Sequence, residues 1–393
     1  MRIRYVLLHA YGMGGTIRTV FNQANAMVAL GHQVEVASVV RRRDLPRFEL
    51  DPRVTLIPLV DQRDGAGQDS VARKLWRRLR GKIVPYGEPA AAFFTERAEK
   101  AVIDYVSTLD GGILVTTRPA LNLIAARRAP AGVIKVGQEH MNLATHREPV
   151  RRQIARHYRR LDAVTVLTAT DRLEYRRLLP DTPVVQIPNA LPPLPGNLSR
   201  QEHPVVVAAG RLVAQKGFDL LIPAFAQVAA RHPEWRLRIF GAGPRKERLS
   251  ALIEEHGMGA HISLKGRSDR LYDEMARASI YALSSRHEGL PMVMIEAMAH
   301  ALPIVAFDCP TGPKDVLTHD VDGLLVPPED VDGLAAALNR LVEDPHLRVR
   351  LGAAAAETAR EYSADAVMPL WEDLFNELLA KEPVTDSFRP SGR

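Results

Sequence analysis

The chain has 393 residues, too many for one hydrophobic core and suited to two α/β domains. Its composition, with 46% hydrophobic and 25% charged residues, is typical of a soluble globular protein. Cys309 is the only cysteine, which excludes an intrachain disulfide, and no segment is long and apolar enough to predict a membrane span, so we expect a cytoplasmic protein.

Positive charge is concentrated in the first half of the chain. Residues 1–195 carry 30 Lys and Arg against 18 Asp and Glu, a net charge of +12, whereas the remaining residues carry −6. Arginines cluster at 41–43, 73–82 and 151–160. Such clusters favour an anionic partner, such as a phosphate-bearing molecule or the inner face of a membrane, although a solvated surface is the simpler interpretation. Nucleic acid ranks last among the partners, because the chain has no recognisable nucleic-acid-binding motif.

Strand-like and helix-like segments alternate along the first half. Short apolar runs predict strands at 3–8, 34–40, 112–116, 133–137 and 163–167. Amphipathic spacing predicts helices at 16–30 and 95–107, whereas residues 60–90 have no clear period. The alternation predicts a Rossmann-like domain, a parallel sheet with crossover helices, over residues 1–190.

A proline-rich stretch, residues 188–204, interrupts this pattern, and we predict an interdomain linker over 191–204. A second domain of the same style is predicted over 205–363, with strands at 205–208, 235–240, 262–264, 279–283, 303–307 and 324–326. Its helices are predicted at 217–231, 246–255, 271–278, from Pro291 onward, at 330–341 and at 345–360. A last helix is predicted at 364–380, and the polar tail 381–393 is predicted to be disordered. Two such doubly wound domains would face a central cleft at the carboxyl ends of their strands, where ligands bind in open α/β sheets.

The segment EGLPMVMIE, from Glu288 to Glu296, is the most informative motif. It follows a predicted buried strand, so Glu288 lies on a strand-to-helix loop and Glu296 lies inside the next helix. The amides around Gly289 and Pro291 then lie at a helix N-terminus, which favours an anion. A phosphate site flanked by two carboxylates suits a sugar nucleotide, because carboxylates accept hydrogen bonds from diols.

Two cations, Arg211 and Lys216, follow the first strand of the second domain in the segment GRLVAQKG. Such a pair can hold a diphosphate, Arg as a planar fork and Lys as a point charge. Taken alone, two surface cations at a helix start are the better interpretation. Together with an anion-binding helix N-terminus in the same domain, the diphosphate interpretation becomes the stronger one.

Three further motifs follow predicted strands. Residues 12–16 (GMGGT) form a glycine-rich turn whose amides can approach a phosphate, although a turn without ligand is nearly as probable a reading. His140, in GQEH, could contact a sugar hydroxyl or assist a proton transfer, although a single His is more often structural. GAGP, with Gly241 and Gly243, and Arg267 after the next strand suit a base or a ribose, and plain turn chemistry explains them equally well. No Cys or His cluster has metal-ligand spacing, and the two D-x-D segments, at 320–322 and 330–332, are interpreted as a turn and a helix N-cap.

These motifs together resemble the nucleotide-binding half of family 4 glycosyltransferases, the large retaining group with the GT-B fold. The resemblance rests on GRLVAQKGFDLLI, FGAGP, SSRHEGLPMVMIEAMAHALPIVAFDCPTGP and DGLLVPPED, in order, over residues 205–341. It is looser in the first half, through GMGG, GQEH and IPNA. The resemblance implies two Rossmann-like domains that face a central cleft, with the last helix crossing back to the first domain.

The family pattern also implies residue roles. Arg211 and Lys216 would neutralise the donor diphosphate, Glu296 would bind the ribose, Glu288 would face the transferred sugar and His140 would contact it. The remaining implied donor contacts are Gly14, Gly15, Gly241, Gly243, Arg267, Gly289, Leu290, Pro291, Met292 and Val293. No metal and no other cofactor is implied. His300 departs from the small residue usual at its position, and we expect a packing change there without loss of activity.

The implied activity is transfer of a sugar from a nucleotide-diphosphate sugar, with a UDP-sugar as first candidate, to an acceptor hydroxyl with retention of configuration. The acceptor would be a cell-envelope polymer, a lipid or a natural product, and the basic first half suits an anionic or membrane-associated one. A sugar-nucleotide epimerase or hydrolase on the same scaffold is the first alternative, and a non-catalytic nucleotide-sugar-binding protein is the second. The sequence leaves the oligomeric state, the nucleotide and the sugar open.

Overall fold

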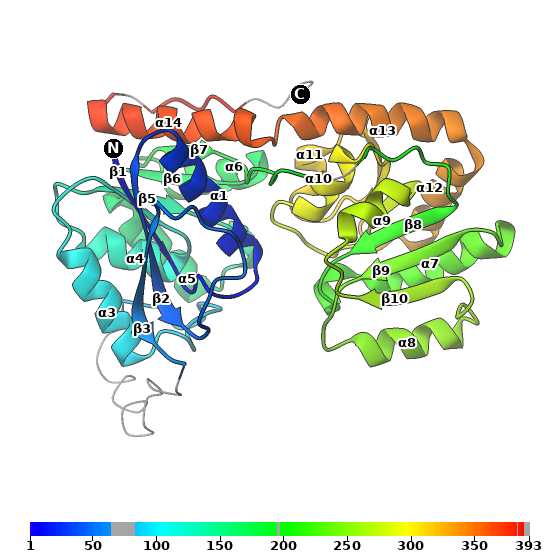
Figure 1. The fold of residues 1–393 in the computed structure, drawn as a ribbon, viewed down its shortest axis with the longest axis horizontal. Helices are drawn as coiled ribbons and strands as arrows, with labels where there is room; N and C mark the ends of the chain where they lie inside the picture. Colours follow the sequence, from blue (N-terminus) through cyan, green and yellow to red (C-terminus); the bar gives the residue numbers. More distant parts are fainter. Residues whose placement is uncertain (64–82, 195–196, 383, 389–393) are drawn as a thin grey trace. The chain divides into compact units, whose positions relative to one another are not determined.

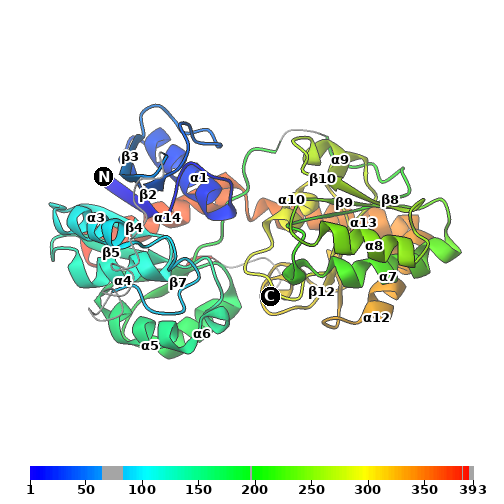
Figure 2. The same ribbon diagram turned by 90° about the horizontal axis from the view of Figure 1, so that it is seen from below.

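The computed structural model describes residues 1–63, 83–194, 197–382 and 384–388, and it divides the chain into two compact units. The first unit comprises Met1–Ala190 together with Val367–Phe388, and the second comprises Leu191–Ala366. Each unit is a sheet flanked by helices, and the bar of Figure 1 locates its elements along the chain (Figures 1 and 2). Each unit also has its own hydrophobic core.

The sheet of the first unit has seven parallel strands in the order β3-β2-β1-β4-β5-β6-β7. These strands are β1 Arg2–Leu7, β2 Gln33–Arg41, β3 Thr55–Asp61, β4 Ile113–Thr116, β5 Ile134–Gln138, β6 Ala163–Val166 and β7 Val184–Gln186. β1 lies between β2 and β4, with Ile3 opposite Val34 and Ile113. The chain direction across the sheet reverses between β1 and β4, which makes this pair the topological switch point.

Helices cover both faces of this sheet, which explains why its central strands read as continuous apolar runs. The helices are α1 Gly15–Ala29, α3 Glu96–Ser107, α4 Pro119–Arg128, α5 Glu148–His157, α6 Ala169–Leu178 and α14 Ala364–Ala380. Two short 3-10 turns, η1 Leu143–Thr145 and η2 Tyr158–Arg160, flank α5. α14 joins this unit from Val367 onward, where Trp371 and Phe375 are fully buried and Glu372 lies 3.5 Å from the ring of His32.

Five elements of the first unit were absent from the sequence prediction: β3, α4, α5, α6 and β7. β3 is an edge strand that contains Pro58 and has mostly half-buried positions, so its alternation is weak. α4 is buried from Pro119 to Ala126 and therefore lacks an amphipathic pattern. α5 and α6 are rich in arginine and bury only two residues each, so their apolar periods are too short to detect. The basic segment 73–82 lies outside the described residues.

The sheet of the second unit has six parallel strands in the order β10-β9-β8-β11-β12-β13. These strands are β8 Val205–Ala209, β9 Arg236–Phe240, β10 Ile262–Gly266, β11 Ile280–Leu283, β12 Ile304–Phe307 and β13 Gly323–Val326. The helices are α7 Phe218–Arg231, α8 Lys246–Glu255, α9 Leu271–Arg277, α10 Met292–Ala299, α11 Pro313–Val316, α12 Val331–Glu343 and α13 Pro345–Arg360, with the 3-10 turn η3 Ala214–Lys216 before α7. All but the short α11 were predicted, because each strand is short and apolar and most helices carry a clear stripe or cap. The switch point of this sheet lies between β8 and β11.

The predicted linker is bound to the second unit over its described part. Residues 191–194 and 197–204 contain no helix or strand. The Leu191 amide donates to the Tyr362 carbonyl at 2.7 Å, and the Ser199 amide donates to the His300 carbonyl at 2.8 Å. The Gln201 side chain also donates to the Ala301 carbonyl at 2.8 Å. This stretch therefore lies along the second unit as a strap.

The prediction of a disordered tail from residue 381 needs correction for residues 384–388. Asp386 pairs with Arg172 and Arg176 of α6, and Phe388 is buried. Thr385 bonds the Glu377 carboxylate of α14. A short polar segment lacks an apolar period, yet specific ion pairs and one aromatic anchor suffice to order it against α6 and α14.

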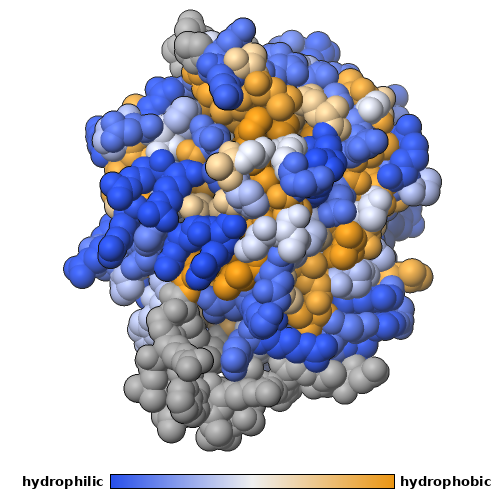
Figure 3. Space-filling model, turned by 90° about the vertical axis from the view of Figure 1, so that its left-hand side faces the viewer, coloured by the Kyte–Doolittle hydropathy of each residue, from blue (hydrophilic) through white to orange (hydrophobic). Residues whose placement is uncertain are grey.

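Hydrophilic and apolar residues are interspersed on the face of the molecule that Figure 3 shows. Within the described residues, no helix combines the length and the apolar character that a membrane span needs.

Candidate functional site

The predicted site residues of the second unit follow the carboxyl ends of neighbouring strands. Arg211 and Lys216 follow β8, and Glu288 follows β11, so these three lie at the switch point of the sheet. Gly241 and Gly243 follow β9, and Arg267 follows the edge strand β10. Because all strands are parallel, their carboxyl ends share one edge of the sheet, which is where open α/β sheets bind ligands.

Lys216 and Glu288, which are 72 positions apart in the chain, form an ion pair at the switch point. The Lys216 Nζ lies 2.5 Å from Glu288 Oε1, and the Ser285 hydroxyl donates to the same oxygen at 2.5 Å. The side chain of Glu288 is 7% exposed and that of Lys216 is 18% exposed. The carboxylate is thus held from two sides, while the ammonium keeps some access to solvent.

The loop that carries Glu288 is tied to the loop after β12. The Glu288 amide donates to the Pro310 carbonyl at 3.1 Å, and the Thr311 amide and hydroxyl donate back to the Glu288 carbonyl at 3.2 Å. Gly312 has a φ of +98°, and a Cβ there would lie 2.2 Å from the Gly289 carbonyl oxygen. Only a glycine fits this approach, which fixes the position of the loop.

A second set of contacts joins the Lys216 turn to the Glu288 loop. The Ser284 hydroxyl donates to the Lys216 carbonyl at 3.0 Å, and the Arg286 amide donates to the Gln215 carbonyl at 2.8 Å. The Arg286 guanidinium forms a bidentate pair with Asp219 of α7, with distances of 2.9 and 3.0 Å. Although burial raises the pKa of Asp219, hydrogen bonding and charge from Arg286 lower it below its usual value. The sequence analysis missed Arg286 as a residue that positions both loops; its place between the motif residues Ser285 and Glu288 was the available signal.

Arg211 is exposed, and its guanidinium makes no hydrogen bond or ion pair to the residues that the structure describes. Arg267 is likewise exposed. Gly241 and Gly243 are required by backbone packing, since a Cβ at Gly241 would lie 1.8 Å from the Gly210 oxygen and one at Gly243 would lie 2.4 Å from the Leu212 oxygen. Turn chemistry therefore accounts for both glycines, and a donor contact at either stays a prediction.

The amides before α10 are available to an anion. Pro291 is the N-cap of α10 and offers no side-chain cap, and the first turn of the helix has no acidic residue. The amides of Met294 and Ile295 bond the Pro291 carbonyl, whereas those of Gly289 and Leu290 make no backbone hydrogen bond among the described residues. Uncapped amides at a helix N-terminus attract negative charge.

Glu296 lies within α10 and is buried, with 5% of its surface exposed. The Tyr281 hydroxyl lies near both carboxylates: burial raises its pKa, and the charges of Glu288 and Glu296 raise it further. Burial, together with Glu288, also raises the pKa of the Cys309 thiol to about 12. The cysteine is therefore a protonated packing residue beneath the Glu288 loop.

His300, which departs from the family pattern, braces the end of α10. Its Nδ1 donates to the Glu296 carbonyl at 2.7 Å, which satisfies one of the free carbonyls at the helix C-terminus. Its ring stacks on Tyr272 of α9, with ring centroids 5.5 Å apart and an interplanar angle of 18°. The His is a packing change that joins α9 to α10.

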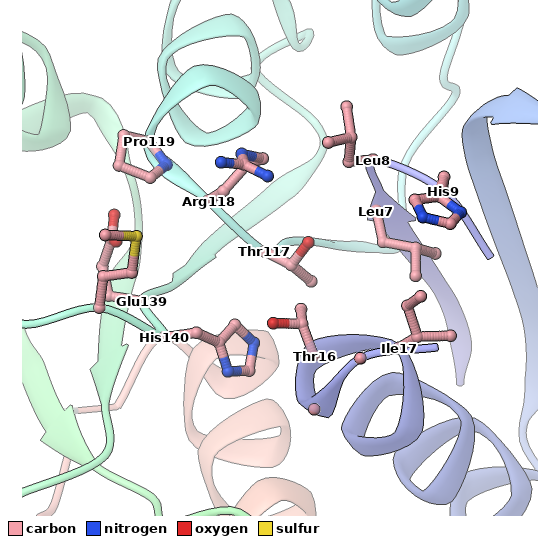
Figure 4. Close-up of a pocket in the computed structure, with 13 residues that line it drawn as sticks. Leu7, Leu8, His9, Thr16, Ile17, Thr117, Arg118, Pro119, Glu139 and His140 are labelled. Carbon is pink, nitrogen blue, oxygen red and sulfur yellow. The ribbon is translucent and has the colours of Figure 1, made fainter. Parts of the chain in front are cut away.

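The predicted site residues of the first unit line one pocket of about 210 Å³. Gly14 and Gly15 at the start of α1, and His140 after β5, lie in it together with Thr16, Thr117 and Arg118 (Figure 4). The pocket lies at the carboxyl ends of β1, β4 and β5, so it occupies the switch point of the first sheet. The sequence analysis missed Arg118, although it directly follows the predicted strand 112–116.

His140 is neutral at physiological pH. Burial, and secondarily the charge of Arg118, lower its pKa to about 4. Its Nε2 is buried and has no hydrogen-bond partner among the described residues. Gly14, Gly15 and His140 belong to one unit, and Arg211, Lys216, Glu288 and Glu296 belong to the other.

The described residues contain no group of His, Cys, Asp and Glu arranged to hold a metal ion. The two D-x-D segments make local contacts instead. Asp322 accepts from the Thr318 amide at 2.7 Å in a turn, and Asp330 caps α12 by accepting from the Gly333 amide at 2.9 Å.

Comparison with known proteins places the second unit in context. Residues 195–358 match the family model described as Glycosyl transferases group 1. Over 97% of its length, the chain is 36% identical to an exopolysaccharide phosphotransferase of Streptomyces coelicolor, but it spans only 41% of that protein. It is 24% identical to an uncharacterized glycosyltransferase of Haemophilus influenzae, covering 95% of this chain and 99% of that one.

Among solved structures, TarM of S. aureus in complex with fondaparinux, alpha-GlcNAc-glycerol and UDP superposes with a TM-score of 0.77. The match covers 95% of this chain and 99% of TarM at 16% identity. The likeness shows the fold: the chain has the GT-B fold of two Rossmann-like domains.

Proposed function

We propose that this protein is a retaining glycosyltransferase that moves a sugar from a nucleotide-diphosphate sugar, a UDP-sugar in the first instance, to an acceptor hydroxyl. The observation that carries the proposal is the Lys216–Glu288 pair at the switch point, beside the uncapped amides of Gly289 and Leu290. A cation and helix amides converge there with a carboxylate, as a sugar diphosphate requires.

The leaving group of such a reaction is a nucleoside diphosphate, whose negative charge grows as the glycosidic bond breaks. Preorganised cations and amides that meet this charge lower the barrier most. Lys216 and Arg211 supply the cations in this proposal, and the N-terminus of α10 supplies the amides. The exposed Arg211 guanidinium has no competing partner among the described residues, so it is available to a phosphate.

Glu288 and Glu296 receive hydroxyls in the same proposal. Glu296 accepts from the ribose diol, and Glu288 orients a hydroxyl of the transferred sugar. The Lys216 ammonium holds Glu288 ionised in the unliganded protein. The departing phosphate oxygen takes the acceptor proton, so no further base is required. Retention follows from the family resemblance, and the first-unit pocket with His140, Gly14 and Gly15 would complete the donor site.

The comparisons support the substrate class. TarM was solved with UDP and a GlcNAc-glycerol product-like molecule, and the match to Glycosyl transferases group 1 covers the segment that carries the site. The named function of the Streptomyces coelicolor relative involves an exopolysaccharide, which favours a cell-envelope polymer as acceptor. No metal takes part in this proposal, because the cations and amides named above carry the charge.

Replacing Lys216 by Ala tests the assignment. We expect kcat/KM for sugar transfer to fall by about 10²- to 10³-fold, because one preorganised charge contributes roughly 3–4 kcal/mol to the transition state. Initial rates with UDP-, GDP- and ADP-sugars measure this and identify the nucleotide. Lys100→Ala, an exposed substitution on α3, is the control.

An unchanged kcat/KM in the Lys216 variant would refute the diphosphate assignment. Products formed without acceptor separate the alternatives: an epimerised or hydrolysed sugar nucleotide as the main product indicates an epimerase or hydrolase. Tight UDP-sugar binding without any turnover, across a panel of polymer, lipid and small-molecule acceptors, indicates a binding protein.

A further inference from the structure

The pocket of the first unit contains more polar groups than the donor assignment uses. Gly14, Gly15 and His140 are accounted for by the proposed donor contacts, but Thr16, Thr117 and Arg118 are not. Figure 4 shows these side chains arranged around the same space as His140. Its volume of about 210 Å³ is smaller than a typical site for a drug-sized ligand and suits one small polar group of a larger molecule.

Arg118 is held in place from behind. Its Nε and Nη2 lie 2.7 and 2.6 Å from Glu88 Oε1, and the Glu88 side chain is fully buried. The other Glu88 oxygen accepts from the Ala90 amide at 2.9 Å. Because Glu88 occupies one edge of the planar guanidinium, the opposite edge, with Nη1, is left for the pocket.

The charges around the pocket favour an anion. Glu139 is the only carboxylate on its lining, and it is engaged with Asn122, Tyr158 and His146 in a buried polar cluster. The lining residue His9 lies close to Arg42 and Arg43: burial lowers its pKa, and these two charges lower it further. His9 and His140 therefore contribute hydrogen bonds without charge, and three arginines dominate the local field.

From this arrangement we infer that the pocket binds a phosphate group of the acceptor, with Arg118 as the principal ligand and the Thr16 and Thr117 hydroxyls beside it. A planar guanidinium with a free edge matches two phosphate oxygens. This subsite rests on the proposed transfer to an acceptor, and it restricts the acceptor to phosphate-bearing molecules. The buried Glu88 is a positioning residue for Arg118.

The test is phosphate binding to the full-length protein saturated with UDP. Inorganic phosphate and glycerol 3-phosphate are titrated and followed by ³¹P NMR line broadening and by calorimetry. We expect Arg118→Gln to weaken phosphate binding at least tenfold while UDP binding changes less than twofold. Arg147→Gln, which removes an exposed arginine beside Gly87 outside the pocket, should leave both affinities unchanged.

A double variant separates binding from folding. Arg118→Gln alone leaves the buried Glu88 unpaired and can destabilise the unit, whereas Glu88→Gln with Arg118→Gln removes both charges. The double variant should melt near the wild type and still fail to bind phosphate. Glu88→Gln alone should strengthen phosphate binding, because it leaves the Arg118 charge uncompensated.

Equal phosphate affinity in wild type and the double variant would overturn the inference. So would competition between phosphate and UDP, because the pocket would then serve the donor diphosphate. Failure of the wild type to bind UDP would instead refute the proposed function, and the phosphate titrations without UDP would still decide whether Arg118 forms an anion site.

Discussion

His140 shows how burial changes the chemistry of a single residue. A histidine with its ordinary pKa would be partly charged near neutrality and could exchange protons with a substrate. Burial, with Arg118 nearby, lowers its pKa to about 4, so at pH 7 it offers one N–H and one lone pair. Such a group suits hydrogen bonding to a sugar hydroxyl better than proton transfer.

The same burial makes the protein sensitive to acid. Between pH 6.5 and about 4 the unfolded chain binds a proton at His140 that the folded protein does not, so the free energy of unfolding decreases as pH falls through this window. One such proton contributes a slope of up to about 1.4 kcal/mol per pH unit. We expect His140→Asn to make this slope shallower in urea denaturation series from pH 4 to 7.

The control is His256→Asn, which replaces an exposed histidine at the end of α8. It should leave the slope unchanged. The burial of His9 and His157, whose pKa values are also lowered, should account for part of the slope that remains. An identical slope in the His140 variant would show that its ionisation is not coupled to folding.

At the scale of elements, the site depends on loops held together at the carboxyl ends of β8, β11 and β12. The Lys216 turn, the Glu288 loop and the segment at Gly312 contact one another through backbone and side-chain hydrogen bonds. Each loop is short, so moving one displaces the others. The positions of the α10 amides and of Glu288 are therefore a joint property of three loops.

Gly312→Ala should break this arrangement. The substitution forces an L side chain into a φ of +98° and places a methyl group 2.2 Å from the Gly289 oxygen. Gly257→Ala is a matched control, because Gly257 also has a positive φ but has open space around its Cβ position. Strain in the left-handed region alone costs about 1–2 kcal/mol, so Gly312→Ala should lose at least about 2 kcal/mol more in urea unfolding.

The Gly312 variant should also bind UDP more weakly, and the Gly257 variant should not. If both variants lose equal stability and retain UDP affinity, the close approach to Gly289 does not set the loop position. Calorimetry with UDP on both variants makes this comparison.

At the scale of the whole molecule, the chain leaves the first unit near residue 190 and returns to it at Val367. Its last helix, α14, thus completes a core that begins 366 residues earlier. Trp371 and Phe375 are fully buried and pack on each other, with ring centroids 5.7 Å apart. The stability of the first unit therefore depends on the end of the chain.

Trp371→Ala should destabilise the first unit selectively. Loss of a large buried aromatic side chain costs about 3–5 kcal/mol. Hydrogen exchange read by mass spectrometry should accelerate in β1, β2 and α1 and stay unchanged over residues 205–360. Leu379→Ala, near the exposed end of α14, is the control and should change little. Equal acceleration in both units would mean that they unfold as one.

Much of the fold was predictable, because alternating apolar runs and amphipathic helices are local patterns. The prediction was best in the second unit, where most helices have a cap or a clear stripe, as Asp330 shows for α12. It was worst for α4, since a helix buried from Pro119 to Ala126 has no polar face to set its period. Edge strand β3, interrupted by Pro58, was missed for the related reason that its burial is partial.

The sequence by itself determined the types of group available for chemistry, through GRLVAQKG, EGLPMVMIE and the glycine-rich turn, and it determined the α/β class, because periodicity is carried by neighbouring residues. Tertiary structure alone decided which groups meet. Lys216 reaches Glu288 because β8 and β11 are adjacent in the sheet, and Arg118 reaches Glu88 because the segment after Ile83 packs beside β4. Strand order is a property of the packed sheet, and no local pattern in the chain encodes it.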